Sequence, residues 1–284
     1  MCFMHPIKPE EAIREAYFEH GIRVFSLDSR SELDKIVRAT SINAQPATDL
    51  TLCVRIQIGA QSSKLNFDAK FGVDGREAIE LLIETRKVAH RLGVCFHLGS
   101  QTMDPADYEQ GGGFPVLYPT MSSPDLSVFF KNIKDAFDGL ALTPTPRLLA
   151  GPGRALSAKY HSIVTRVENR RGNKLYINVE AYGVLFDGAY MKWRYKARLL
   201  REPPSTPEDE AFSFYGPTCD SLDYMPGPFY LPGGVREHDD LEILNVSAYV
   251  WTMRPFNGFS SYKYAVLKTR MSYRLPLQGP SIRP

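Results

Sequence analysis

Residues 214–223, FYGPTCDSLD, put a thiol directly beside a carboxylate in a segment that favours a turn. Gly216 and Pro217 are turn-forming residues, and Cys219 and Asp220 follow them closely. A positioned thiol can deliver a proton near neutral pH, so the pair could serve acid catalysis. The segment by itself also allows a plainer interpretation, a small buried thiol next to a carboxylate that caps the turn.

A second set of residues could bind an anion. Glycine-rich stretches at 111–113 and 151–153, and the loop at 97–100, can present backbone N–H groups. Arg154 adds a guanidinium, which pairs well with phosphate. Together they predict a phosphate-bearing ligand. Taken alone, GPGR also allows a turn, and His97 also allows a core histidine with satisfied hydrogen bonds.

The elements that would position these residues alternate in the first half of the chain. Apolar spacing and flanking Pro, Ser and Gly residues predict helices at 9–20, 29–39 and 75–92, the last ended by Gly93. Strands are predicted at 23–27, 50–58 and 94–98. Such alternation indicates a parallel sheet or barrel with its ligand site at the carboxyl ends of the strands, where Asp28 and Arg55 could form an ion pair.

From about residue 155 the pattern becomes strand-like and aromatic, without a long helix. The strand patterns are HSIVTRVEN, KLYINVEAYG, DLEILNVSAYVW and YKYAVLKT. Residues 201–210 are predicted to be a charged, proline-rich surface loop and residues 275–284 a loose tail. We expect two domains: an α/β domain over residues 1–154 and an all-β domain over residues 155–284.

Composition indicates an ordinary globular protein. Hydrophobic residues make up 43%, charged residues 23%, and the formal net charge is +2, without the basic excess of a nucleic-acid-binding protein. No apolar run approaches the ~18 residues of a membrane span, and we expect a cytoplasmic protein without a membrane partner. The four cysteines have no CxxC spacing, so neither a metal site nor a disulfide framework is predicted.

Ten short motifs in one order resemble the fold-type III pyridoxal-phosphate decarboxylases, in particular their ornithine and lysine decarboxylase branch. The motifs are HPIK (5–8), FSLDSRSEL (25–33), LCVRI (52–56), KFGV (70–73), CFHLGSQ (95–101), GGGFP (111–115), GPGRAL (151–156), YGVLFDGAY (182–190), YGPTCDSLD (215–223) and SAYVWTMRPFNGF (247–259). The resemblance covers almost the whole chain. It implies a (β/α) barrel followed by a C-terminal β domain.

The resemblance also implies roles for individual residues. His97 would lie against the ring of the cofactor, pyridoxal 5'-phosphate, and Cys219 would donate a proton to the carbanion left after decarboxylation. Asp187 and Asp220 would receive the distant amine of a basic amino acid. The remaining residues implied for cofactor binding are Arg55, Ser100, Gly113, Gly151, Gly153, Arg154 and Tyr249.

The implied activity is decarboxylation of ornithine or lysine to a diamine for polyamine synthesis. A homodimer with shared active sites is implied, with Phe256 at the interface. A second hypothesis is an inactive relative that acts as a binding or regulatory partner of an intact decarboxylase. An amino-acid racemase of the same fold is a weaker alternative, because no motif supplies the tyrosine acid that it needs.

Three departures from the family pattern bear on catalysis. No lysine can be assigned to the Schiff base, because Lys8 matches a different position and Lys268, in YAVLK, lies in the wrong domain. Gly151 stands where the family has a glutamate that pairs with the pyridine nitrogen. Residues 101–110 are too few for a helix and a strand, so we expect about five barrel strands, near residues 3, 24, 53, 95 and 148, instead of eight.

Overall fold

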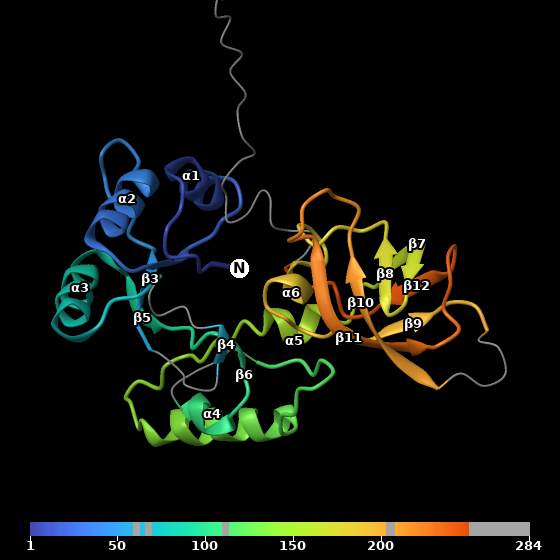
Figure 1. Cartoon of the computed structure of the whole chain (residues 1–284). Coiled ribbons are helices and arrows are strands. Elements are labelled where there is room, and N and C mark those ends of the chain that lie inside the picture. Colours follow the sequence, from blue (N-terminus) through green and yellow to red (C-terminus); the bar gives the residue numbers. More distant parts are fainter. Residues whose placement is uncertain (59–62, 66–69, 110–113, 203–207, 250–284) are drawn as a thin grey trace, which may run out of the picture.

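The computed structural model describes residues 1–58, 63–65, 70–109, 114–202 and 208–249. Figure 1 shows two halves: a parallel sheet with its helices, and a β domain formed by the later part of the chain. The predictions made for Gly113, Phe256, the YKYAVLKT strand and the tail lie outside the described residues.

A four-stranded sheet with the order β1-β2-β3-β5 organises the first half. Its strands are β1 (Cys2–Phe3), β2 (Val24–Leu27), β3 (Thr51–Arg55) and β5 (Arg91–Cys95). Every neighbouring pair is parallel. The predicted parallel arrangement is therefore confirmed, and the described residues supply four strands to this sheet where eight close a barrel.

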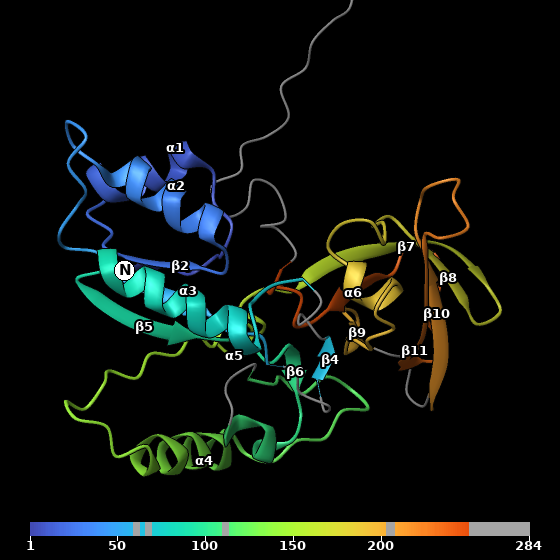
Figure 2. The same ribbon diagram turned by 90° about the vertical axis from the view of Figure 1, so that its left-hand side faces the viewer.

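Three helices cover one face of this sheet (Figures 1 and 2). They are α1 (Glu10–Phe18), α2 (Arg30–Thr40) and α3 (Gly75–Val88). The Ser29 side chain caps α2 by accepting a hydrogen bond from the N–H of Glu32 at 3.3 Å. The apolar faces of the helices bury Ile13, Ile36 and Leu81 against the strands, as their helical spacing predicts.

The boundary between α3 and β5 differs from the prediction. The helix ends at Val88, and Gly93 lies inside the strand rather than stopping the helix. A Cβ atom at position 93 would lie 2.8 Å from the Cys53 sulfur on the neighbouring strand. Gly93 is therefore needed for close strand packing.

The strand predicted near residue 148 is wrong. Residues 143–152 form no strand, and Leu148 and Leu149 are exposed. A strand there would need ladder hydrogen bonds, and among the described residues this segment pairs neither with the free edge of β5 nor with any other strand. As expected, residues 101–109 contain no βα unit, only β6 (Ser100–Thr102), paired with β4 (Ser63–Leu65), and the 3-10 helix η1 (Pro105–Glu109).

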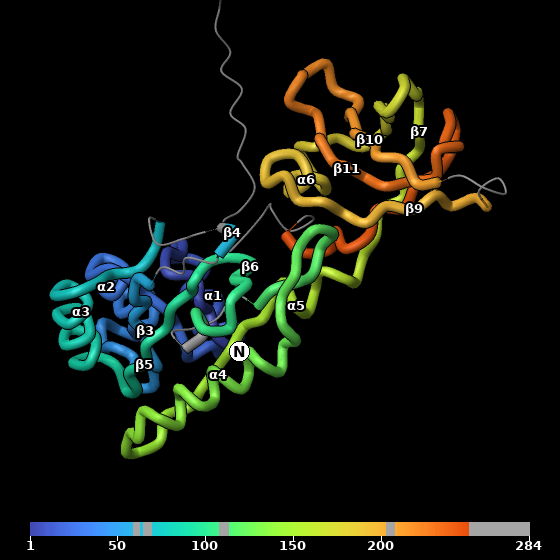
Figure 3. The backbone as a smooth tube through the Cα atoms, turned by 60° about the horizontal axis from the view of Figure 1, so that its bottom comes forward, coloured from blue at the N-terminus to red at the C-terminus, as the bar shows by residue number. Residues whose placement is uncertain are grey.

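Between the two halves the chain passes through β6, α4 (Leu126–Gly139) and α5 (Gly153–Ser157), a path that can be followed in Figure 3. Phe129 of α4 is fully buried against Phe114. The Gln101 side chain donates to the carbonyl of Val116 and accepts from its N–H, both at 2.7 Å. This reciprocal pair ties β6 to the segment that enters the β domain.

The β domain is a six-stranded sheet with the order β11-β10-β8-β7-β12-β9. The strands are β7 (Ile163–Arg171), β8 (Lys174–Ile177), β9 (Ala197–Leu199), β10 (Asp209–Tyr215), β11 (Tyr224–Pro232) and β12 (Asp240–Ile243). Its end strands, β9 and β11, also contact each other. The one-turn helix α6 (Phe186–Ala189) packs on β11. The predicted fold class, an incomplete parallel barrel followed by a β domain, is confirmed.

Each half has its own apolar core. The core of the β domain also includes Val116 and Tyr118, which lie before the boundary predicted at residue 154. That boundary stays a prediction. Among the described residues, no helix is both long and apolar enough to cross a lipid bilayer.

Candidate functional site

Three groups of the predicted residues can be distinguished by their contacts. The first lies at the carboxyl ends of β3 and β5. Arg55 ends β3, and its guanidinium carbon lies 4.9 Å from the centre of the Phe71 ring. His97 follows β5, and its Nδ1 accepts a hydrogen bond from the N–H of Gly99 at 2.9 Å. Asp28 accepts from the N–H of Gly72 at 3.0 Å, and its charge acts on Arg55 by raising the pKa of the guanidinium against the larger effect of burial.

Burial sets the protonation of this first group. Desolvation, with a smaller contribution from the positive charge of Arg55, lowers the pKa of His97 to about 4. Burial also lowers the pKa of Arg55. On the strand beside it, desolvation raises the pKa of the Cys95 thiol to about 12. At neutral pH this group therefore presents a neutral imidazole and an unreactive thiol.

The predicted anion loops are only partly described. Ser100 is buried at the start of β6, and Gly113 lies outside the described residues. Gly151 is exposed, and a Cβ atom built there would meet nothing within 4 Å. Gly153 begins α5, where a Cβ atom would lie 3.7 Å from the Tyr249 hydroxyl.

The second group surrounds Arg154. One terminal nitrogen of its guanidinium, Nη1, lies 3.2 Å from Oδ2 of Asp187 and donates to the Tyr118 hydroxyl at 3.2 Å. The guanidinium carbon lies 4.5 Å from the Trp193 ring centre and 4.8 Å from that of Tyr249. Burial raises the pKa of the Asp187 carboxyl, and Arg154 opposes this shift. The structure thus brings Arg154, Asp187 and Tyr249 together.

The third group is the turn between β10 and β11, which carries Cys219 and Asp220. Both residues are exposed. Buried Asp223 holds the turn, because its Oδ2 accepts from the N–H and the hydroxyl of Thr218 at 2.9 and 2.8 Å. Its Oδ1 accepts from the N–H of Ala181 at 2.6 Å, which fixes the turn to the segment after β8. The thiol and carboxylate therefore stand on a rigid base.

Asp220 is organised by its own neighbours. It accepts a hydrogen bond from the N–H of Leu222 at 2.9 Å and another from the Tyr182 hydroxyl, and these bonds lower the pKa of its carboxyl. Tyr182 lies beside Tyr190, which stacks on Phe186 of α6 with ring centres 4.6 Å apart. Asp187 belongs to the same helical turn, so α6 links the second and third groups.

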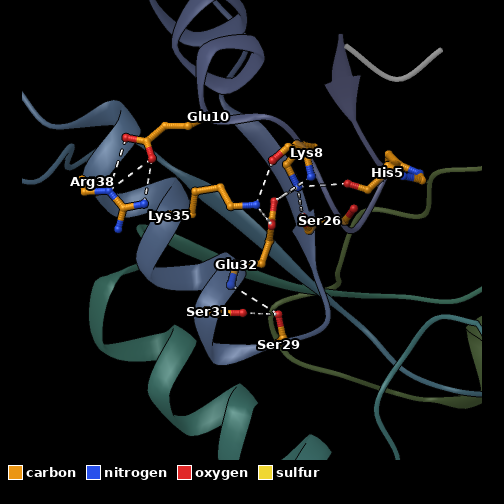
Figure 4. Close-up of polar contacts among 9 residues, drawn as sticks. All are labelled: His5, Lys8, Glu10, Ser26, Ser29, Ser31, Glu32, Lys35 and Arg38. Atoms are coloured by element: carbon orange, nitrogen blue, oxygen red, sulfur yellow. Dashed lines mark hydrogen bonds and ion pairs between the residues drawn. The ribbon is translucent and has the colours of Figure 1, made fainter. Parts of the chain in front are cut away.

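Lys8 belongs to the HPIK motif, and Figure 4 shows how its side chain is held. Its Nζ donates to the carbonyls of His5 and Ser26 at 2.9 and 2.6 Å and lies 3.0 Å from Oε1 of Glu32. Lys35 binds the other oxygen of Glu32 at 2.6 Å. Three acceptors match the three N–H donors of an ammonium group, so Lys8 is a buried structural cation and not a free nucleophile.

Two residues that organise the candidate site were not predicted from the sequence. Tyr118 binds Arg154 from a segment that has no motif of its own. Asp223 could have been recognised, because it is the second of the two acidic residues in the motif that contains Cys219 and Asp220. In the part of the chain that the structure describes, no three His, Cys, Asp or Glu residues gather as metal ligands.

Known proteins resemble this chain in sequence and in fold. The family described as pyridoxal-dependent decarboxylase, pyridoxal binding domain, matches residues 1–111. A lysine/ornithine decarboxylase of Selenomonas ruminantium is 27% identical over 91% of this chain and 70% of its own length. A solved lysine/ornithine decarboxylase from Vibrio vulnificus, complexed with cadaverine, superposes with a TM-score of 0.70 at 26% identity, covering 94% of this chain and 75% of that one. Antizyme inhibitor 2 of Xenopus laevis is 24% identical over 91% of this chain and 64% of its own length.

Proposed function

We propose that this chain, which is related in sequence and fold to the pyridoxal-dependent decarboxylases, takes part in the decarboxylation of lysine or ornithine to a diamine. The proposal includes pyridoxal 5'-phosphate as the cofactor and a homodimer with shared active sites as the assembly. It places the protein in the cytoplasm and its reaction in polyamine synthesis. The resemblance found in the sequence is confirmed by these relatives.

The observation that carries the proposal is the organised turn of Cys219 and Asp220. Asp223 and Tyr182 fix the backbone and the carboxylate, so an acid and an anionic group point outward together. An exposed carboxylate is suited to hold the distant ammonium group of a diamino acid. Cys219 is suited to deliver a proton at the other end of the substrate. Because both residues are exposed, they could act on a substrate bound by a second subunit.

The described residues do not fit pyridoxal phosphate in this conformation. Arg154, the predicted phosphate ligand, is already paired with the carboxylate of Asp187. The amine of Lys8 is saturated by three acceptors, and Gly151 offers no side chain to a pyridine nitrogen. We therefore assign no chemical step to the cofactor-binding half of this chain.

Activity of the purified chain tests the proposal. With pyridoxal phosphate and either lysine or ornithine, the chain should release a diamine, measured by chromatography. Cys219→Ala should lower the rate by about 100-fold, the typical loss for a positioned acid. Cys2→Ala, at another exposed cysteine, is the matched control and should leave the rate unchanged. Absence of diamine from both substrates would contradict decarboxylation by this chain alone.

A second candidate is an inactive partner of a complete decarboxylase. The misfit at Lys8, Gly151 and Arg154 favours it, and one relative is named as an antizyme inhibitor rather than as a decarboxylase. Mixing the chain with a full-length lysine/ornithine decarboxylase should then produce a mixed dimer on size-exclusion chromatography and alter the turnover per complete subunit. Separate elution with unchanged turnover would contradict this role.

A further inference from the structure

Arg154 has an unusual environment for a residue predicted to bind an anion. Its side chain is 6% exposed, and the Asp187 side chain beside it is 13% exposed. Water screens such a pair poorly, so the carboxylate neutralises most of the charge that an incoming anion would encounter. A buried guanidinium without a partner would be strongly unfavourable, which explains why the pair forms.

The ion pair with Asp187 leaves some of the hydrogen-bond donors of Arg154 without a partner. Asp187 contacts the guanidinium through Nη1 alone, where a carboxylate can bind an arginine through two parallel hydrogen bonds. The Nε atom of Arg154 is buried and has no hydrogen-bond partner among the described residues. An unmet buried donor costs about 1–3 kcal/mol. An anion with several oxygens, such as a phosphate monoester, could accept from Nε and Nη2, the two donors that lie on the same side of the guanidinium.

The surroundings keep the guanidinium in place whether or not Asp187 remains. Trp193 and Tyr249 contact it through their rings, and Tyr118 accepts a hydrogen bond from it. Tyr118 is itself packed against Trp193, with ring centres 5.4 Å apart. Asp187, in contrast, belongs to a four-residue helix, which can shift at a smaller cost than a sheet.

We propose that Asp187 competes with anions for the charge of Arg154, so that a phosphate monoester binds this chain weakly while the Asp187 carboxylate stays paired with the guanidinium. The inference rests on the proposed function only for the class of ligand. It makes Asp187 a residue that controls anion affinity in place of a receptor for the substrate amine.

Binding measurements without any amino acid test the inference. Calorimetric titration of the full chain with pyridoxal phosphate should give at least about tenfold tighter binding for Asp187→Asn than for the wild type, because the competing charge is gone. Pyridoxal, which lacks the phosphate, should bind both proteins equally. The double variant Arg154→Gln/Asp187→Asn should lose the gain. Asp240→Asn, which removes the acid of an exposed ion pair with Arg166, is the matched charge control and should bind like the wild type.

Equal affinity of the wild type and Asp187→Asn for pyridoxal phosphate would overturn the inference, as would an equal gain with pyridoxal. Asp187→Asn could be only marginally folded, which would prevent calorimetry. In that case its melting temperature is measured with and without inorganic phosphate, since a ligand that binds the folded state raises the melting temperature. Stabilisation by phosphate supports the inference, and its absence contradicts it. Diamine production is measured separately from binding. If the wild type makes diamine but binds pyridoxal phosphate as tightly as Asp187→Asn does, the inference is contradicted and the proposed function is supported.

Discussion

His97 should make the stability of the protein depend on pH. Its pKa is lowered to about 4, mainly by desolvation and then by Arg55, from an ordinary value of 6.5. The unfolded chain therefore binds more protons between these values, so stability should fall as the pH drops from 6.5 towards 4. The largest possible loss is about 3 kcal/mol, measured by urea unfolding across this pH range.

The variant His97→Asn should flatten this dependence. His90→Asn, at an exposed histidine, is the control and should retain it. His5, whose pKa is also lowered by burial, gives a smaller background slope in every protein. An unchanged slope in His97→Asn would show that the imidazole is not the group that titrates.

For single residues, the sequence identified the candidate functional side chains more reliably than it identified the residues that contact them. Cys219 and Asp220 were selected by their types and spacing, and the structure places them on one turn. The pairing of Arg154 with Asp187 was not predicted, because it joins residues 33 positions apart through the packing of α6. Such contacts depend on the fold and have no local pattern.

Gly93 offers a test at the scale of strand packing. In Gly93→Ala the new methyl group would lie 2.8 Å from the Cys53 sulfur, so β3 and β5 must separate or the thiol must move. Overpacking of this kind costs about 1–3 kcal/mol of unfolding free energy, measured by urea titration. The double variant Gly93→Ala/Cys53→Ala should recover most of the loss.

Gly139→Ala is the matched control for this substitution. Gly139 ends α4, and a Cβ atom there would meet nothing within 4 Å. Alanine also favours the helix more than glycine does, so this variant should be equally stable or slightly more stable. A Gly93→Ala protein as stable as the wild type would contradict the close packing of β3 and β5.

Helices and strands were predicted correctly where the local sequence pattern agrees with the packing of the segment in the folded protein. The helices at 9–20 and 29–39 and the strand at 23–27 appear within a few residues of their expected bounds. β11 was not predicted, because its segment YMPGPFYLP contains prolines and a glycine, which normally break strands. Its place at the end of the six-stranded sheet allows them, since an end strand needs hydrogen bonds on one side only.

In the molecule as a whole, the sheet of the β domain has its end strands in contact, whereas the parallel sheet of the first half does not close among the described residues. The β domain closes around one core, with β9 and β11 in contact. In the described part of the parallel sheet, β5 has β3 as its one neighbour, and its other edge is open. The motif order alone could predict missing strands, but not which edge would remain open, because that depends on which strands pair.

The open edge of β5 should make the isolated chain self-associate. Leu92 and Val94 alternate along β5 and are 37 and 50% exposed, on the face that α1, α2 and α3 cover farther along the sheet, and Phe96, directly after the strand, is 40% exposed. An exposed apolar edge strand with free backbone groups pairs readily with another chain. Light scattering after size-exclusion chromatography should therefore show a mass that grows with protein concentration.

Val94→Lys should reduce this association, because a charge on an edge strand opposes pairing. Val164→Lys is the control: Val164 is 57% exposed, but it lies on β7, which has strands on both sides. The control should associate like the wild type, since no backbone groups are free there. A wild-type monomer that melts in one sharp, concentration-independent transition would contradict the open edge, because a sheet with unpaired strands and exposed apolar faces should be only marginally stable alone.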